Sequence, residues 1–174
     1  MRPFDADELH AALGTLADRL QQRRANARLY VVGGAAMILA HGATHSTLDV
    51  DAAIEGDYQT VIDAVRGIAR ERNWPTTWLN EQATPYMPPP HRRDGITVLD
   101  HPHLRVDAAS AAQMLAMKAR AARRADTGDV RRLARLTGAG SVEQVERLVA
   151  DAFGSSTLDD RQRQWLNAVL AARG

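Results

Sequence analysis

Apolar residues recur along the chain at two spacings, which predict helices alternating with short strands. Apolar positions three and four residues apart are typical of amphipathic helices, and short runs rich in β-branched residues are typical of strands. Helices are predicted at 5–24, 35–41, 58–72, 111–124, 126–138, 141–153 and 158–172. Strands are predicted at 29–32, around 49–51, at 96–99 and at 104–106. Asp5 and Glu8 have the spacing of a capping box for the first helix. The order predicts an α/β fold, with a small mixed sheet and a helical C-terminal part.

The segment 29–54 carries the main motif of the sequence, and the other predicted elements are arranged around it. It reads as a buried strand, the pair Gly33-Gly34, a short helix, a polar loop and a second strand carrying Asp49-Val50-Asp51. In a strand, residues two apart point to the same face, about 6.5 Å apart at roughly 3.3 Å per residue. Asp49 and Asp51 should therefore lie side by side, with Leu48, Val50 and Ala52 facing the core.

Two neighbouring carboxylates repel each other unless a cation lies between them. Mg²⁺ prefers oxygen ligands and is often held by carboxylates together with substrate phosphates, and Mn²⁺ is an alternative. Backbone N–H groups at a glycine turn that opens a helix favour an anion. The pattern therefore indicates a site for a nucleoside triphosphate (NTP). Taken singly, the Asp pair could be a solvated strand face and Gly33-Gly34 a plain turn.

The length, charge and composition of the chain argue against several other classes of protein. The chain has 174 residues, which we interpret as a core at 1–110 that carries the Asp pair and a helical part at 111–174, forming one compact unit. A formal net charge of +1 argues against a protein whose whole surface is basic and binds polyanions. The chain has no cysteine, no apolar run long enough to cross a membrane and no secretory signal at its start. We therefore expect a cytoplasmic protein without a membrane partner.

The ordered run of strand, Gly33-Gly34, short helix and Thr47-Leu48-Asp49-Val50-Asp51 resembles the polymerase-β-like nucleotidyltransferase superfamily. Within it, the segment is most similar to the minimal bacterial nucleotidyltransferases of the AbiEii and MenT-type toxin group and to related families of unknown function. The resemblance covers roughly residues 28–136, including the run Met114-Leu115-Ala116-Met117-Lys118 and the segment from Asp126 to Asp129. It implies a Mg²⁺-dependent enzyme with NTP as substrate, Asp49 and Asp51 as metal ligands, and Gly33, Gly34 and Thr47 at the nucleotide.

The downstream residues add four further candidates. Lys118 lies in the apolar stripe of its predicted helix, so it either snorkels to water or reaches an anion. The resemblance favours the anion, since the family has a lysine there that faces the triphosphate, with the acid at Asp129 nearby. Asp107 could be a third metal ligand or a helix cap, and Asp126 a further site residue or a cap.

Two surface features could contact a nucleotide or RNA. The proline-bearing segment 73–95 contains Asn80, a candidate hydrogen-bond partner for base or sugar. Its aromatic residues could stack on a base, although Trp78 and Leu79 could equally cover the core. Arg120, Arg123 and Arg124 would share one flank of a continuous helix and could hold an RNA backbone, or form a solvated face.

Three functions fit these features. The first is a toxin that adds nucleotides to RNA, at the 3′ end of tRNA, and is neutralised by an antitoxin protein. The second is a nucleotidyltransferase that modifies a protein or a small molecule such as an antibiotic. The third is a non-catalytic binding module on a nucleotidyltransferase fold, against which the intact pair of Asp49 and Asp51 argues.

Overall fold

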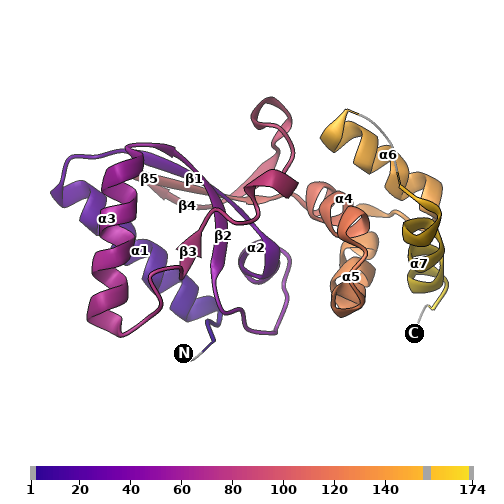
Figure 1. Cartoon of the computed structure of the whole chain (residues 1–174), viewed down its shortest axis with the longest axis horizontal. Helices are drawn as coiled ribbons and strands as arrows, with labels where there is room; N and C mark the ends of the chain where they lie inside the picture. The colour runs from indigo at the N-terminus through magenta and orange to yellow at the C-terminus, as the bar shows by residue number, and fades with distance from the viewer. Residues whose placement is uncertain (1–2, 155–157, 173–174) are drawn as a thin grey trace. The chain divides into compact units, whose positions relative to one another are not determined.

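A computed structural model describes residues 3–154 and 158–172 of the chain (Figure 1). The chain forms two compact units, of which the first is Met1–Pro85 with Gly95–Ala109 and the second is Tyr86–Asp94 with Ser110–Gly174. Within the described residues, no helix is both long and apolar enough to cross a membrane. The α/β fold class is confirmed, with a five-stranded mixed sheet and a helical C-terminal part.

The first unit is built on this sheet, in which the strands lie in the order β3-β2-β1-β5-β4. β1 pairs antiparallel with β2 and parallel with β5, while β4 pairs antiparallel with β5 and β2 pairs parallel with β3. The strands are β1 (Ala27–Val32), β2 (Val50–Gly56), β3 (Leu79–Asn80), β4 (Gly95–His101) and β5 (Leu104–Ala109). β3 was not predicted, because it has only two residues and no alternating pattern of its own; its pairing with β2 defines it.

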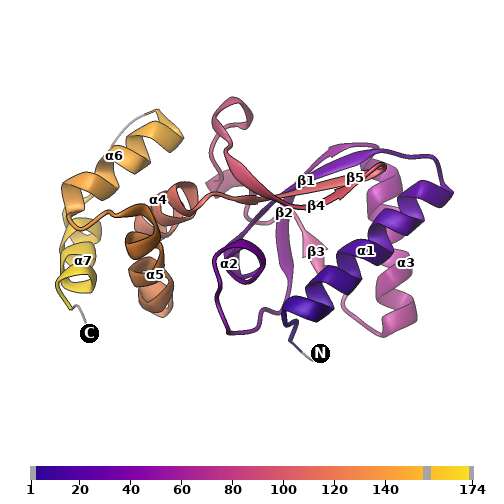
Figure 2. The ribbon, with the colours of Figure 1, turned by 180° about the vertical axis from the view of Figure 1, so that it is seen from behind.

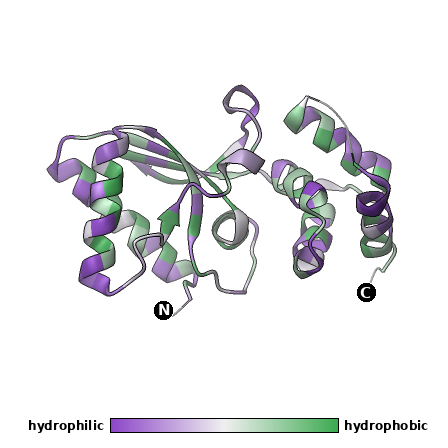
Figure 3. Ribbon diagram, viewed as in Figure 1, coloured by the Kyte–Doolittle hydropathy of each residue, from purple (hydrophilic) through white to green (hydrophobic). Residues whose placement is uncertain are grey.

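Three helices complete the first unit: α1 (Ala6–Gln22), α2 (Gly33–Ala40) and α3 (Tyr58–Arg72). α1 begins with the predicted capping box of Asp5 and Glu8. α1 and α3 pack beside each other on one side of the sheet, as seen from both directions (Figure 1, Figure 2). Every turn of α3 carries both hydrophobic and hydrophilic residues, as an amphipathic helix requires (Figure 3).

The core of the first unit contains the apolar face of the sheet and an aromatic cluster. Trp78 is 1% exposed and donates its indole N–H to the Val65 carbonyl over 3.1 Å. Phe4 packs edge-on against Trp74, with ring centroids 4.8 Å apart. Trp78 and Leu79 are thus core residues, as one of the two interpretations of the segment 73–95 proposed.

The second unit consists mostly of helices. They are α4 (Ala111–Ala121), α5 (Thr127–Thr137), α6 (Val142–Phe153) and α7 (Asp160–Ala171), with the 3-10 turn η2 (Pro90–Arg92) and the 3-10 turn η3 (Arg124–Asp126). α6 and α7 each begin with a capping box, at Ser141 and Asp159. In η2, Arg92 donates to the Asp151 carbonyl of α6 over 3.0 Å, so the segment 86–94 packs with the helices rather than with the sheet.

Candidate functional site

The antiparallel register of β1 and β2 builds the first half of the site. Val32 at the end of β1 is opposite Asp51, so the next residue, Gly33, lies beside the Asp51 carboxylate. Gly33 has φ +68°, and a Cβ at this residue would lie 3.2 Å from Asp51 Oδ2. A side chain at this position would strain the backbone and also crowd the carboxylate.

Gly34 makes a second close approach, to Thr47. A Cβ at Gly34 would lie 2.7 Å from Thr47 Oγ1, closer than real Cβ atoms come to other heavy atoms. Thr47 is held by a backbone bridge to Phe4 and donates its hydroxyl to the Asp49 carbonyl over 3.2 Å. The structure thus brings together Gly33, Gly34, Thr47 and Asp51 on elements of the first unit.

α2 begins directly at Gly33, without the separate glycine turn that the sequence predicted. Its N-cap residue is Val32, which makes no side-chain hydrogen bond to the first turn. The N-terminus of a helix favours negative charge and offers backbone N–H donors. The start of α2 therefore has the chemistry to receive a phosphate near Asp51.

Asp49 and Asp51 are both half-buried, but only Asp51 belongs to the strand. β2 begins at Val50, and Leu48 is 59% exposed, so the prediction that Leu48 faces the core is wrong. The alternation does not extend that far because Leu48 lies in a bend between the Thr47 bridge and the start of β2. Val50 and Ala52 are fully buried, as predicted.

Asn80 is the neighbour of the Asp pair on β3. It is opposite Asp51 in the parallel register of β2 and β3, and its Nδ2 donates to Asp49 Oδ2 over 3.5 Å. Two backbone groups fix the same amide: Nδ2 donates to the Thr77 carbonyl, and Oδ1 accepts from the Gln82 N–H. The amide is therefore held beside the Asp49 carboxylate, and its predicted contact with a base or sugar stays a prediction.

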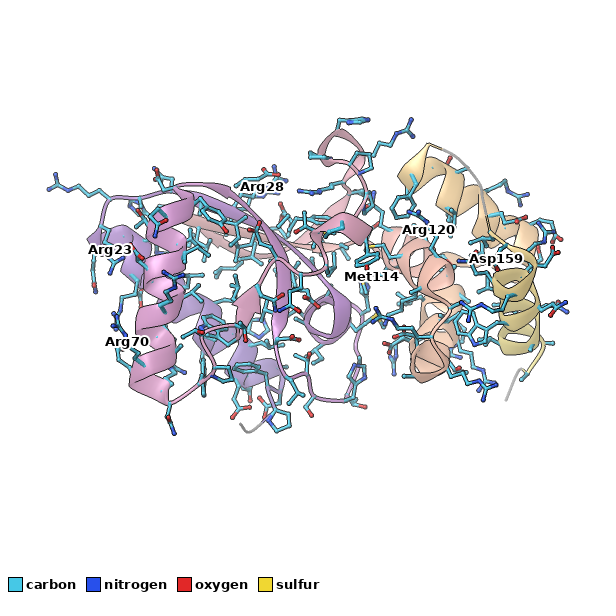
Figure 4. The ribbon with its side chains drawn as sticks, viewed as in Figure 1. Arg23, Arg28, Arg70, Met114, Arg120 and Asp159 are labelled. Carbon is cyan, nitrogen blue, oxygen red and sulfur yellow. The ribbon has the colours of Figure 1, made fainter. Side chains whose placement is uncertain are left out.

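Asp107 has a different environment. It is 3% exposed, lies on β5, two strands from β2, and pairs in register with Tyr30 of β1. Arg28 lies 2.7 Å from Asp107 Oδ2, Arg105 lies 3.1 Å from Oδ1, and Thr97 donates to Oδ1 over 2.7 Å. These contacts join β1, β4 and β5. Figure 4 shows Arg28 projecting from the side of the sheet opposite α1 and α3.

The charges around Asp107 determine its titration. Burial raises the pKa of the Asp107 carboxyl, but hydrogen bonds from Arg105, Thr97 and Arg28 outweigh burial and hold the pKa below the ordinary value of 3.8. A lowered pKa means that the carboxylate stabilises the fold above that ordinary value and loses this contribution as pH falls through the folded pKa. The geometry favours a structural role for Asp107.

Lys118 lies in the second unit with two of the other candidates. Its side chain is buried, with Nζ 2.5 Å from Asp126 Oδ1 and 2.9 Å from Asp129 Oδ2. Asp126 is the N-cap residue of α5 but makes no capping hydrogen bond, and its carboxylate is bonded to Lys118. The predicted place of Lys118 in an apolar stripe is confirmed, because Met114 and Leu115 beside it are fully buried.

The predicted arginine flank is wrong as a continuous helical face. α4 ends at Ala121, and Ala122 has φ +46°, a left-handed conformation that breaks the helix. Arg123 is in extended backbone and Arg124 begins η3, so three-residue spacing no longer aligns them with Arg120. Arg120 instead lies over the Phe153 ring, 4.1 Å from its centroid.

Among the described residues, 3–154 and 158–172, no three His, Cys, Asp or Glu side chains converge as a metal site. The carboxylate oxygens of Asp49 and Asp51 are nevertheless the donor type that Mg²⁺ and Mn²⁺ prefer. Further ligands would then come from phosphate oxygens and water, as is usual for Mg²⁺.

The first unit thus combines a mixed sheet, a helix that opens with glycine and a carboxylate pair, a combination that is compatible with a nucleotide-transferring enzyme. Consistent with this, a family model described as "Nucleotidyltransferase of unknown function (DUF6036)" matches residues 8–171. The chain belongs to this family. No curated protein and no solved structure matches it.

The contact between Gly34 and Thr47 can be tested by substitution. Gly34→Ala should lower the free energy of unfolding by about 1–3 kcal/mol, as overpacking usually does. In a Thr47→Ala background the same change should cost much less, because the clashing hydroxyl is gone. Denaturant unfolding of the four proteins measures the coupling, and an equal cost in both backgrounds would contradict the close approach.

Asp107→Asn should destabilise the fold by about 1.5–3 kcal/mol, since hydrogen bonds from two charged groups are lost. The difference from wild type should be full near neutral pH and should shrink below about pH 4, where the carboxylate begins to protonate. Unfolding curves at several pH values measure this difference. Binding of Mn²⁺ should be unchanged, and weaker binding would instead place Asp107 among the metal ligands.

Proposed function

We propose that this nucleotidyltransferase is Mg²⁺-dependent, transfers a nucleotide from an NTP to RNA at the 3′ end of tRNA, and acts as the toxin of a toxin–antitoxin pair. The observation that carries the transfer chemistry is the approach of the Gly33 and Gly34 backbone to Asp51 and Thr47. This approach places a helix N-terminus, which favours phosphate, beside carboxylates, which favour a divalent cation.

Asp49 and Asp51 would hold the metal ion, and Mn²⁺ would fit the same oxygen ligands. When bound, the ion would supply positive charge to the triphosphate and to the charge that develops on its oxygens. Asn80 would keep the Asp49 carboxylate in place through its amide. Gly33 and Gly34 would then bind the phosphates through backbone N–H donors, and the Thr47 hydroxyl would leave the Asp49 carbonyl to donate to a phosphate.

The reaction balances as a displacement at phosphorus. The acceptor hydroxyl oxygen bonds to the α-phosphorus, the bond from that phosphorus to the bridging oxygen breaks, and pyrophosphate leaves with the bonding pair. The hydroxyl proton is released to solvent. Because this chemistry needs little covalent help, positioning and charge are the main contributions that the protein can make.

RNA as the acceptor and the role of toxin rest on the resemblance to the AbiEii and MenT-type group. A cognate antitoxin protein is part of the same proposal. A protein acceptor or a small molecule such as an antibiotic remains the competing outcome of an assay with labelled nucleotide.

Asp49→Asn and Asp51→Asn should each reduce transfer of labelled nucleotide to tRNA by roughly a hundredfold or more, because a metal ion contributes several kcal/mol to such reactions. The midpoint of thermal unfolding should change little, because both side chains are only half-buried. Binding of Mn²⁺, measured by calorimetry, should weaken in both variants.

Full transfer by either variant would contradict the metal role. Labelling of a protein or small-molecule fraction, with none of RNA, would replace the proposed acceptor but keep the enzyme class. No transfer to any acceptor by the wild type, with NTP still bound, would favour a binding module.

Lys118 has a proposed role at the phosphates, with Asp126 and Asp129 holding its ammonium group. Lys118→Ala should weaken binding of a non-hydrolysable NTP more than Lys118→Arg, since Arg retains the charge. Both variants need a thermal melt beside the titration, because removal of a buried cation leaves two carboxylates facing each other. Equal affinity in wild type and Lys118→Ala would assign Lys118 to stability alone.

A further inference from the structure

The outer surface of α1 and α3 contains a cavity of about 660 Å³ lined mostly by arginine. Its lining is Arg23, Asp63, Arg66, Arg70 and Thr76, all in the first unit and all exposed. Figure 4 shows Arg23 and Arg70 on the same outer side of these helices. Three positive charges and one negative give the lining a formal charge of +2, compared with +1 for the whole chain.

These arginines differ from their neighbours on the same surface. Arg19 pairs with Glu71 at 2.5 Å, and Arg72 donates to Thr15 over 2.9 Å and lies over the Trp74 ring. Those two join α1, α3 and the loop after α3. By contrast, in the part of the chain that the structure describes, the side chains of Arg23, Arg66 and Arg70 form no hydrogen bond or ion pair. Arg19 and Arg72 therefore have structural roles in the first unit, whereas Arg23, Arg66 and Arg70 form no such interaction with the described residues.

We propose that this cavity, the arginine cavity, binds the phosphodiester backbone of a nucleic acid strand. Arg66 and Arg70 lie one turn apart on α3, about 6 Å along the axis at 1.5 Å per residue, so they can contact successive phosphates. The guanidinium fork matches phosphate oxygens in pairs, and the Thr76 hydroxyl adds a donor. The lining contains no apolar side chain that could insert among lipid chains, which suits a polyanionic strand better than a bilayer.

The proposal deepens the proposed function by giving an RNA acceptor a surface on the first unit, and it rests on that function for the identity of the strand. The test is anisotropy of a short labelled single-stranded RNA with the full chain, without NTP or divalent metal. Arg66→Glu with Arg70→Glu should weaken binding at least about tenfold and reduce the salt slope by roughly 1.4, about 0.7 for each lost phosphate contact.

A matched control reverses two exposed arginines of the second unit, Arg147→Glu with Arg161→Glu, and changes the net charge equally. It should bind RNA nearly as the wild type does. Asp63→Asn should tighten binding, because it removes the negative charge from the lining. Thermal melts should agree among all the variants, since each substituted residue is exposed.

Equal weakening in the reversal and control variants would overturn the proposal, as would a wild type that does not bind RNA or binds only anionic vesicles. The result is separable from catalysis when the assay is repeated with Asp51→Asn. RNA binding by the wild type that depends on Arg66 and Arg70, with no nucleotide transfer to any acceptor, would support the arginine cavity and count against the proposed function. Transfer to tRNA that survives the reversal with unchanged KM would remove the arginine cavity but keep the enzyme.

Discussion

The close approach of backbone and carboxylate between β1 and β2 is the constraint on which the candidate site depends. Antiparallel pairing puts Val32 opposite Asp51, and the chain must then turn directly into α2 beside that carboxylate. Glycine suits both positions, because a Cβ at Gly33 would crowd Asp51 on a left-handed backbone and a Cβ at Gly34 would meet the Thr47 side chain. The pairing that forms the core therefore also places a helix N-terminus beside an acid.

The carboxylates of the first unit have two kinds of surroundings. Those of Asp107 indicate a structural role, whereas those of Asp49 and Asp51 suit the proposed metal site. Asp107 is surrounded by Arg28, Arg105 and Thr97, which satisfy its charge within the fold and lower its pKa. The Asp49 carboxylate instead accepts a hydrogen bond from the Asn80 amide, and the Asp51 carboxylate lies beside the Gly33 backbone. Two neighbouring carboxylates repel each other and favour a cation between them, whereas the single Asp107 carboxylate already pairs with two arginines.

Much of the fold could be predicted because periodicity reflects burial over many residues, as the match of α3 to the predicted helix 58–72 illustrates. Elements set by contacts distant in sequence could not. β3 exists only through pairing with β2, and α4 ends at Ala121 because Ala122 takes a left-handed conformation without a glycine to signal it. The grouping of Gly33, Gly34 and Asp51 followed from local order, but the place of Asn80 required the sheet register.

The cluster at Lys118 shows which of two competing interactions the chain retains. An N-cap hydrogen bond at Asp126 would contribute about 1 kcal/mol, whereas a buried ammonium without its partner costs roughly 3–5 kcal/mol. The Asp126 carboxylate accordingly bonds Lys118 and leaves α5 without a side-chain cap. Asp129 is the second carboxylate at the Lys118 ammonium group, 2.9 Å from Nζ. A phosphate that approached Lys118 would therefore compete with both carboxylates for the same ammonium group.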